Sequence, residues 1–245
     1  MMKSASMANM TQGKPIGLLL RFAVPMLIGN LFQQAYNLVD SLVVGNFVGT
    51  QALAAVSIAN YPNRVLLALF VGLGMGGTIR IAQHTGANNL DGARKVIQSA
   101  NGLIQLVSLP LTAIGLLLSS PVLSLMRTPP DAFADASAYL SILFVGTLPL
   151  LGFNLNAGIL RGLGDSRSPV LFLLVATVTN IALDLLFVAV LGWGVVGAAV
   201  ATVIAMGVAW GFSLVFIHRK YPQYRTPLWP LRIDREALSD IFRLG

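Results

Sequence analysis

The chain has 245 residues, of which 56% are hydrophobic and only 10% are charged, and its mean hydropathy is +0.77. A soluble domain usually carries about 25% charged residues, because it needs a solvated surface. We therefore expect lipid to cover much of this chain, which excludes an ordinary soluble domain. The chain has no cysteine, which excludes disulfides and thiolate metal sites, and its two histidines are too few for a histidine metal cluster.

Six apolar segments are long enough to cross a bilayer, since about 20 helical residues span about 30 Å of hydrocarbon. Residues 1–15 precede them, form a polar amino-terminal segment and lack the apolar core of a cleavable signal peptide. The predicted spans are residues 16–44, 52–79, 97–118, 136–158, 168–191 and 194–217. Together they predict an all-α, polytopic bundle in which residues 16–218 form one six-helix transmembrane lobe.

The basic residues predict how the bundle is oriented. If the amino terminus is inside, all but two of the 16 Lys and Arg fall at the cytoplasmic ends of the spans and in the tail. The exceptions are Arg127, outside, and Arg64, within the second span. The positive-inside rule therefore predicts a multi-pass protein of the plasma membrane (in bacteria the inner membrane) with a cytoplasmic amino terminus. Topology accounts for the net charge of +7, so we expect no nucleic-acid partner.

The first span carries a polar face. At 100° per residue, this face covers an arc of about 120° and is bordered by Tyr36. Its members are Asn30, Gln33, Gln34, Asn37, Asp40 and Ser41. Lipid cannot hydrogen-bond such a face, which must therefore meet protein or water. Pro25, in the same span, and Pro149, in the fourth, are expected to bend or locally unwind their helices.

Two of the nine acidic residues lie within predicted spans, Asp40 near the outer end of the first and Asp184 in the fifth. An ionised carboxylate in hydrocarbon is costly, so an intramembrane acid indicates a function. Asn180 lies one helical turn before Asp184 and should share its face. Asn154, Asn156 and Thr202 add polar groups in spans four and six, where they could equally hold helices together.

Two acids facing one cavity could bind either of two cations. Burial and mutual repulsion would favour a proton on one of the acids. Alternatively, oxygen ligands from the acids, Asn180 and Thr202 would suit Na⁺, because hard cations prefer oxygen donors. The residues themselves leave both ions open.

Residues 219–245 are predicted to form a cytoplasmic interlobe loop and the start of a second lobe. Asp234 is expected to cap a helix that begins at Arg235, with Leu238, Ile241 and Phe242 on one face. The segment Ile241 to Gly245 resembles the segment Leu19 to Ala23, as expected of a repeated transporter half.

Three motifs resemble the multidrug and toxic compound extrusion (MATE) family, and within it the DNA-damage-inducible protein F branch. They read RGLGDSRSP at 161–169, NIALD at 180–184 and GWGVVGAAVAT at 192–202. Pro25 and AQHTGA at 82–87 support the resemblance. It implies a twelve-helix antiporter of two six-helix lobes, not an enzyme. Such an antiporter exports drugs or other organic compounds, often cations, in exchange for H⁺ or Na⁺ by alternating access.

The resemblance also implies roles for individual residues. The cation-coupling site, with Na⁺ as one candidate ion, would comprise Asp40, Asn180, Asp184 and Thr202; the substrate cavity would include Gln33, Tyr36, Asn37 and Asn154, and Pro25 would be a hinge. No cofactor is expected beyond the coupling ion. The implied partners are the lipid bilayer, small organic substrates and a second lobe, supplied by a carboxy-terminal half or a second half-transporter.

Three alternatives remain open on the sequence. A lipid flippase would line its cavity with basic residues, for which only Arg64 is a candidate. An intramembrane aspartyl protease is suggested by the GxGD pattern that ends at Asp165, but we expect this acid to stay solvated and ionised in a cytoplasmic loop. A protease dyad instead shares a proton within the membrane. A purely structural subunit would leave the two intramembrane acids unexplained.

Overall fold

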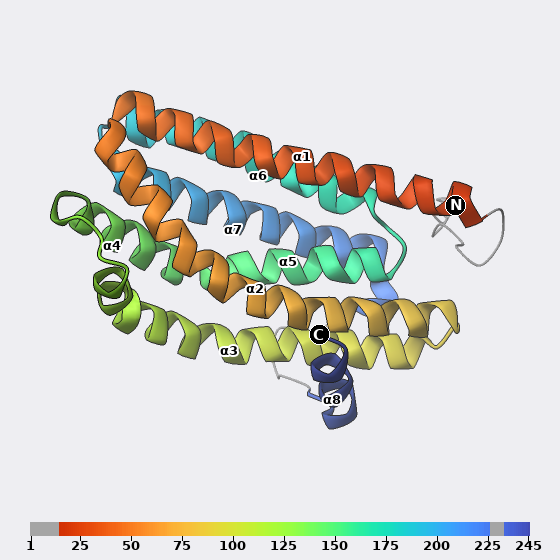
Figure 1. Cartoon of the computed structure of the whole chain (residues 1–245). Coiled ribbons are helices and arrows are strands. Elements are labelled where there is room, and N and C mark those ends of the chain that lie inside the picture. Colours follow the sequence, from red (N-terminus) through yellow and green to blue (C-terminus); the bar gives the residue numbers. More distant parts are fainter. Residues whose placement is uncertain (1–14, 226–232) are drawn as a thin grey trace.

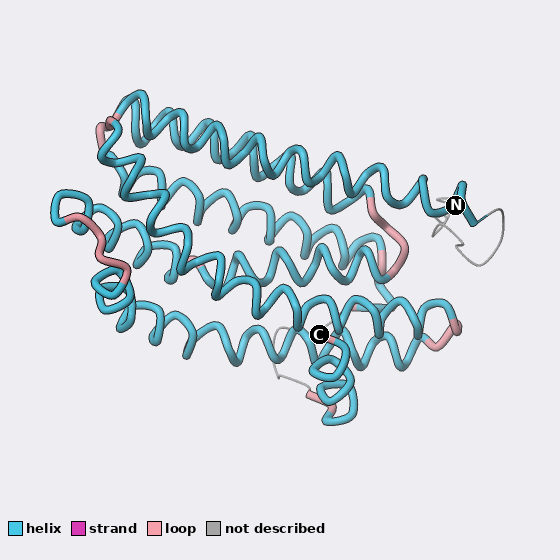
Figure 2. The backbone as a smooth tube through the Cα atoms, in the orientation of Figure 1, coloured by secondary structure: helices cyan, strands magenta, loops and turns pink. Residues whose placement is uncertain are grey.

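The computed structural model describes residues 15–225 and 233–245. The predicted amino-terminal segment therefore lies outside the described residues except for its last position, as does part of the predicted interlobe loop. The described chain is helical throughout, joined by short turns (Figures 1 and 2), which confirms the all-α prediction. Its helices are α1 (Pro15–Phe47), α2 (Thr50–Gly86), α3 (Leu90–Leu125), α4 (Pro130–Val145), α5 (Thr147–Gly162), α6 (Arg167–Asp184), a π-helix (Leu185–Val190), α7 (Gly194–Lys220), a 3-10 turn (Pro222–Tyr224) and α8 (Arg235–Leu244).

The helices follow the six predicted spans in order. Among the described residues, α3, α6 with its π-helical end, and α7 are individually long and apolar enough to cross a membrane. Two further spans result if α2 and the α4–α5 pair, each of which bends, are counted as one span each. The remaining predicted span is α1, whose 33 residues extend for about 50 Å at 1.5 Å per residue.

Of the two prolines predicted to disturb their helices, one lies at a break and the other lies within a continuous helix. The axes of α4 and α5 differ by 54°, and the break precedes Pro149, which has no N–H to donate to the carbonyl of Val145. The prediction of a bend at Pro149 is therefore confirmed. The helix α1 is instead continuous across Pro25. The two halves of α2 meet at 48°.

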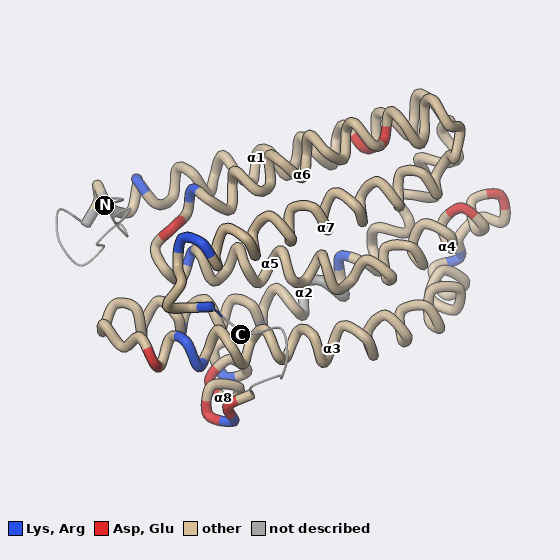
Figure 3. Tube along the Cα trace, turned by 180° about the vertical axis from the view of Figure 1, so that it is seen from behind, with Lys and Arg blue, Asp and Glu red and all other residues tan. Residues whose placement is uncertain are grey.

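The bundle has α1 and α6 side by side at one face, α5 and α7 in the middle, and α2 with α3 at the opposite face (Figure 1). Lys and Arg gather at one end, where α1 begins and where α2 and α7 end (Figure 3). This is the end that the charge pattern predicts to be cytoplasmic.

Two apolar clusters fill the interior, one toward each end of the bundle. The cluster at the basic end includes Ile81, Phe172 and Met206, and the other includes Val44, Tyr139 and Ala199. In α1, α6 and α7, chain positions between the two clusters carry polar side chains. The interior is therefore interrupted near the middle of these helices.

The helix α8 lies across α2 and α3 (Figure 1). Asp234 caps it by accepting a hydrogen bond from the backbone N–H of Ala237 (3.0 Å), as predicted. Its buried residues are Ala237 and Ile241, whereas Phe242 is exposed. The predicted apolar face of Leu238, Ile241 and Phe242 is therefore right at Ile241 and wrong at Phe242, while Leu238 is half-buried. Arg80 of α2 forms an ion pair with Asp240 (2.7 Å), which fixes the crossing.

Candidate cation-binding site

The four residues predicted to form a cation site come from three neighbouring helices. Asp40 is on α1, Asn180 and Asp184 are on α6, and Thr202 is on α7. The structure brings them together between the two apolar clusters. Asn180 and Asp184 are fully buried and Asp40 is 6% exposed, so bulk water does not solvate either carboxylate.

A hydroxyl on α7 joins the three helices. Thr202 Oγ1 accepts a hydrogen bond from the Tyr36 hydroxyl (3.3 Å) and a longer one from Asn180 Nδ2 (3.5 Å). Tyr36, predicted to line a substrate cavity, is buried beside the candidate site. The Asp40 and Asp184 carboxyl groups lie within hydrogen-bonding reach of each other.

Several oxygens at this point lack a hydrogen-bond donor among the described residues. They are Asp40 Oδ1, Asn180 Oδ1 and both carboxylate oxygens of Asp184. Two ionised carboxylates cannot donate to each other, so their oxygens need a proton, a metal ion or another donor between them. A buried charge without a partner costs several kcal/mol and a buried amide oxygen costs less, so three carboxylate oxygens and one amide oxygen left without donors in one place are unusual for packing alone.

The chemistry of these donors fits a light cation. Among the described residues, no three His, Cys, Asp or Glu side chains are grouped so that they could hold a metal ion, so the donor set here is two carboxylates supported by amide and hydroxyl oxygens. Such oxygen ligands suit Na⁺, and a pair of adjacent carboxylates also suits a shared proton. The donor set does not choose between the two ions.

Sequence reasoning missed two residues near the site. Tyr139 of α4 is fully buried, shares a hydrogen bond with Asn60 of α2, and interacts electrostatically with Asp40 and Asp184. Both residues lie in predicted spans, so their polar groups were a usable signal. Spacing within one span does not reveal which neighbouring helix it faces, and a tyrosine in an apolar run is equally typical of a core.

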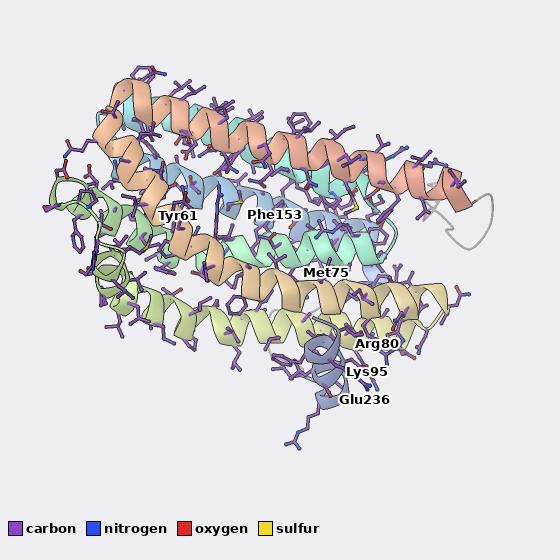
Figure 4. All side chains as sticks on the ribbon, in the orientation of Figure 1. Tyr61, Met75, Arg80, Lys95, Phe153 and Glu236 are labelled. Atoms are coloured by element: carbon purple, nitrogen blue, oxygen red, sulfur yellow. The ribbon has the colours of Figure 1, made fainter. Side chains whose placement is uncertain are left out.

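The predicted cavity residues separate into two places. Gln33 and Asn154 line one small cavity of about 180 Å³ between α1, α5 and α6. Asn154 also lines a larger cavity of about 1000 Å³ between α1, α2 and α5, on whose wall Met75 lies (Figure 4). Asn37 is half-buried on α1, and its backbone oxygen accepts a hydrogen bond from Ser41.

Several other polar residues have structural partners. Thr177 donates to the carbonyl of Leu173 in its own helix (2.8 Å). Asn156 donates to Ser213 Oγ (2.7 Å), which links α5 to α7. On α1, Asn30 and Gln34 are exposed, so the predicted polar face meets protein over only part of its width. Arg64 is exposed on α2 and lines neither of the two cavities described above.

Asp165 differs from its prediction, because partners rather than water hold its charge. Its carboxylate accepts hydrogen bonds from Ser168 N (3.0 Å), Ser168 Oγ (2.7 Å), Lys220 Nζ (2.8 Å) and the Tyr221 hydroxyl (3.1 Å), and its side chain is only 11% exposed. Burial raises the pKa of Asp165, but the bonds from Lys220 and Ser168 outweigh burial and leave the pKa below its usual value. Asp165 therefore stays ionised.

Comparison with known proteins gives consistent matches. The MatE family model matches residues 25–186. The chain is 32% identical to the "Probable multidrug resistance protein YpnP" of Bacillus subtilis over 97% of this chain and 53% of that protein. It is 34% identical to the "Probable multidrug resistance protein YoeA" of the same organism over 91% of this chain and 50% of that protein.

A solved structure matches nearly the whole chain. It is described as the outward-facing conformation of a multidrug resistance MATE family transporter of the MOP superfamily. The TM-score is 0.88 at 32% identity, and the match covers 99% of this chain and 54% of that one. This chain thus spans about half the length of the curated relatives and the solved structure that it matches.

Proposed function

The chain belongs to the MatE family of multi-pass membrane transporters, and we propose that it forms the cation-coupling lobe of a drug antiporter. The proposed activity is export of organic compounds in exchange for H⁺ or Na⁺ by alternating access. The second lobe would come from a further six-helix unit, either on the same polypeptide or in a second half-transporter.

One observation carries the proposal: four buried oxygens of Asp40, Asn180 and Asp184 converge without donors. A transporter must hold its coupling ion strongly enough to bind it and weakly enough to release it. Oxygens that no described donor satisfies are free to bind the ion, which meets the first condition. These oxygens lie where α1 and α6 meet, with α7 beside them. A shift of one helix would move some of the oxygens away from the ion and weaken its binding, which meets the second condition.

In the proposed exchange, the two acids take up the cation on the outside and release it on the inside. When the site is open to the outside, Asp40 and Asp184 accept a cation, and Tyr36 and Thr202 orient the α6 ligands through their hydrogen bonds. A bound cation cancels one of the two buried charges and so lowers the cost of burying the pair; the lobe can then close around the site and reopen inward. Release of the cation inside restores the charge and with it the affinity for the next cation.

The test is to remove each acid without changing its shape. We expect Asp40→Asn and Asp184→Asn each to reduce drug resistance, in cells that carry the complete gene, to the level of cells without it. Immunoblots should show unchanged membrane expression. The matched control is Asp131→Asn, which neutralises an exposed carboxylate at the start of α4 and should keep full resistance. Full resistance in both site variants would overturn the coupling role.

Several finer points belong to the same proposal. We propose that the lobe lies in the bacterial inner membrane with its amino terminus in the cytoplasm, which the basic end of the bundle supports (Figure 3). Membership of the DNA-damage-inducible protein F branch remains a prediction from the sequence motifs. The contribution of Pro25 as a hinge is likewise a prediction, because α1 is continuous in this structure.

The GxGD pattern that ends at Asp165 does not support the hypothesis of an intramembrane aspartyl protease. A protease acid must share a proton with a second acid, but the Asp165 carboxylate is ion-paired to Lys220 and accepts three further hydrogen bonds. The family to which the chain belongs is also one of transporters. The flippase hypothesis depended on Arg64, which lies away from both cavities, so a basic group for it must be sought elsewhere.

A further inference from the structure

The larger cavity has an unusual charge distribution. Its volume of about 1000 Å³ lies at the upper end of the range typical of small-molecule sites. Most of its lining is apolar, including Phe22, Phe70 and Leu155. Of the residues described on its wall, Arg161 alone is charged, and the same side chain also lines the smaller cavity beside Gln33 and Asn154.

The Arg161 side chain has no hydrogen bond or ion pair among the residues that the structure describes. The acid four residues later, Asp165, is committed to Lys220, Ser168 and Tyr221. The last carbonyls of α5, including that of Arg161 itself, accept hydrogen bonds from Leu163, Gly164 and Asp165. The guanidinium therefore lacks the partners that neutralise the charge of other basic residues nearby.

Position alone does not explain this arginine. A cation in the last turn of a helix gains about 0.3–1 kcal/mol from the helix dipole, but that gain does not require the side chain to line a cavity. A guanidinium in a partly buried apolar space loses hydration, and that loss is recovered only if an anion or several acceptors approach. Its planar donors suit the two oxygens of a carboxylate, sulfonate or phosphate.

We propose that this cavity binds an amphiphilic anion, with Arg161 holding its anionic group and the apolar wall of α1, α2 and α5 holding its body. The inference builds on the proposed transport function and deepens it by naming a substrate class. It differs from the organic cations that the family resemblance implies, because no acidic side chain lies on the described wall of the cavity.

A pair of matched fluorescent probes tests the proposal. The anionic probe is 8-anilinonaphthalene-1-sulfonate, and the neutral probe is N-phenyl-1-naphthylamine, which has the same aromatic body without the sulfonate. Both are titrated onto the full chain in nanodiscs of zwitterionic lipid, with empty nanodiscs subtracted. We expect Arg161→Gln to raise the Kd of the anionic probe about tenfold, as for loss of one charge-assisted contact, and to leave the Kd of the neutral probe unchanged.

Two further variants separate charge from folding. Arg161→Lys keeps the charge and should retain most of the anionic probe's affinity. Arg94→Gln removes an exposed basic residue of α3 that does not line the cavity, and it should change neither Kd. An unchanged anionic Kd in Arg161→Gln would overturn the proposal. Equal weakening of both probes in that variant would do the same, because it would mean that the residue only shapes the cavity.

Competition shows which source of anions the site accepts. Short-chain phosphatidylglycerol that displaces the sulfonate, where phosphatidylcholine does not, would identify a lipid headgroup; displacement only by soluble aromatic carboxylates would identify a free anion. Displacement by an organic cation such as ethidium, at matched concentration and with no anion competing, would contradict the proposal. None of these measurements depends on ion coupling. The anion site can therefore be disproved while Asp40 and Asp184 still prove essential for drug resistance, and the coupling role can be disproved while the probes still bind as expected.

Discussion

At the scale of single residues, the hydroxyl of Thr202 joins α1, α6 and α7. It accepts hydrogen bonds from Tyr36 and Asn180, and so positions the Asn180 amide, which lies one helical turn before Asp184. Thr177 is buried and has the same side chain, but it donates only to its own helix. The pair offers a direct comparison between a hydroxyl at the site and one beside it.

We predict that Thr202→Val lowers the cation affinity of the chain by about three- to tenfold, because valine keeps the shape but removes a hydrogen-bonding oxygen. Thr177→Val should lower it by less than about twofold. Isothermal titration of the purified chain with Na⁺, and proton release measured at low buffering, would give both values. Equal affinities in the two variants would exclude a role of Thr202 in positioning.

The hydrogen bonds and the ion pair of the Asp165 carboxylate predict a pH-dependent contribution to stability. Because its pKa is lowered in the folded state, ionised Asp165 stabilises the fold at pH values above its unfolded pKa of about 3.9. This contribution disappears as the pH falls through the folded-state pKa. We expect Asp165→Asn to cost about 1–3 kcal/mol at pH 7.

The difference in melting temperature between Asp165→Asn and the unaltered chain should therefore shrink below about pH 4. Asp91→Asn, at an exposed carboxylate at the start of α3, is the control and should melt like the unaltered chain. A difference that stays constant from pH 7 to pH 3 would show that the charge of Asp165 contributes nothing.

The sequence predicted which residues meet at the candidate site better than it predicted their surroundings. Asp40 and Asp184 were predicted because a carboxylate in an apolar span is rare. Asn60 and Tyr139 were missed because neutral polar groups are common in spans. The solvated loop expected for Asp165 was wrong because its partner, Lys220, is 55 residues away in the chain.

At the scale of elements, α8 packs on α2 where α2 has no side chain. A Cβ atom added at Gly76 would collide with the carbonyl oxygen of Ile241 and would lie 2.8 Å from the backbone nitrogen of Gly245. The close approach buries Ile241 and aligns Arg80 with Asp240. The contact between α2 and α8 thus depends on one missing methyl group.

We predict that Gly76→Ala displaces α8 and destabilises the chain by about 1–3 kcal/mol, as overpacking does. Gly74→Ala is the matched control on the same helix, since its Cβ would meet nothing within 4 Å. Hydrogen exchange of the α8 amides should rise in the first variant and stay unchanged in the second. Unchanged protection of α8 in Gly76→Ala would mean that the contact is looser than described.

The orientation of the bundle can be tested because the chain has no cysteine. Lys95→Cys and Ser124→Cys place single thiols at exposed positions near opposite ends of α3. We predict that a membrane-impermeant maleimide labels Ser124→Cys in intact spheroplasts and labels Lys95→Cys only after lysis. The opposite pattern would place the amino terminus outside.

Helix positions followed from apolar runs, but two details of the helices did not. The run at 136–158 signals the 54° break only through Gly146 and Pro149, and the size of the break depends on how α4 and α5 pack on α2 and α7. The six π-helical residues after Asp184 have an ordinary apolar sequence, LLFVAV. A π-turn is stabilised by its neighbours, here including the stacking of Phe187 on Trp193, rather than by local preference.

At the scale of the whole molecule, ion binding should raise thermal stability. A ligand that binds only the folded state stabilises it by about 2.7 kcal/mol at about 100 times its Kd. If Na⁺ is the coupling ion, we predict that adding it, with K⁺ as the control salt, raises the melting temperature of the unaltered chain but not of Asp184→Asn. A rise in both proteins, or equal rises with the two salts, would exclude specific Na⁺ binding and favour the proton.

The π-helix gives this ion dependence a structural route. Its backbone hydrogen bonds, such as that from Leu191 N to Leu186 O (2.9 Å), join residues five apart rather than four apart as in an α-helix. The turn directly after Asp184 therefore contains one residue more than an α-helical turn. If that residue were taken up or given back, the segment 185–190 would rotate by about 100° while the rest of α6 stayed in place. The Asp184 carboxylate would then lie next to a segment with two possible helical registers, and binding of the ion would favour one of them.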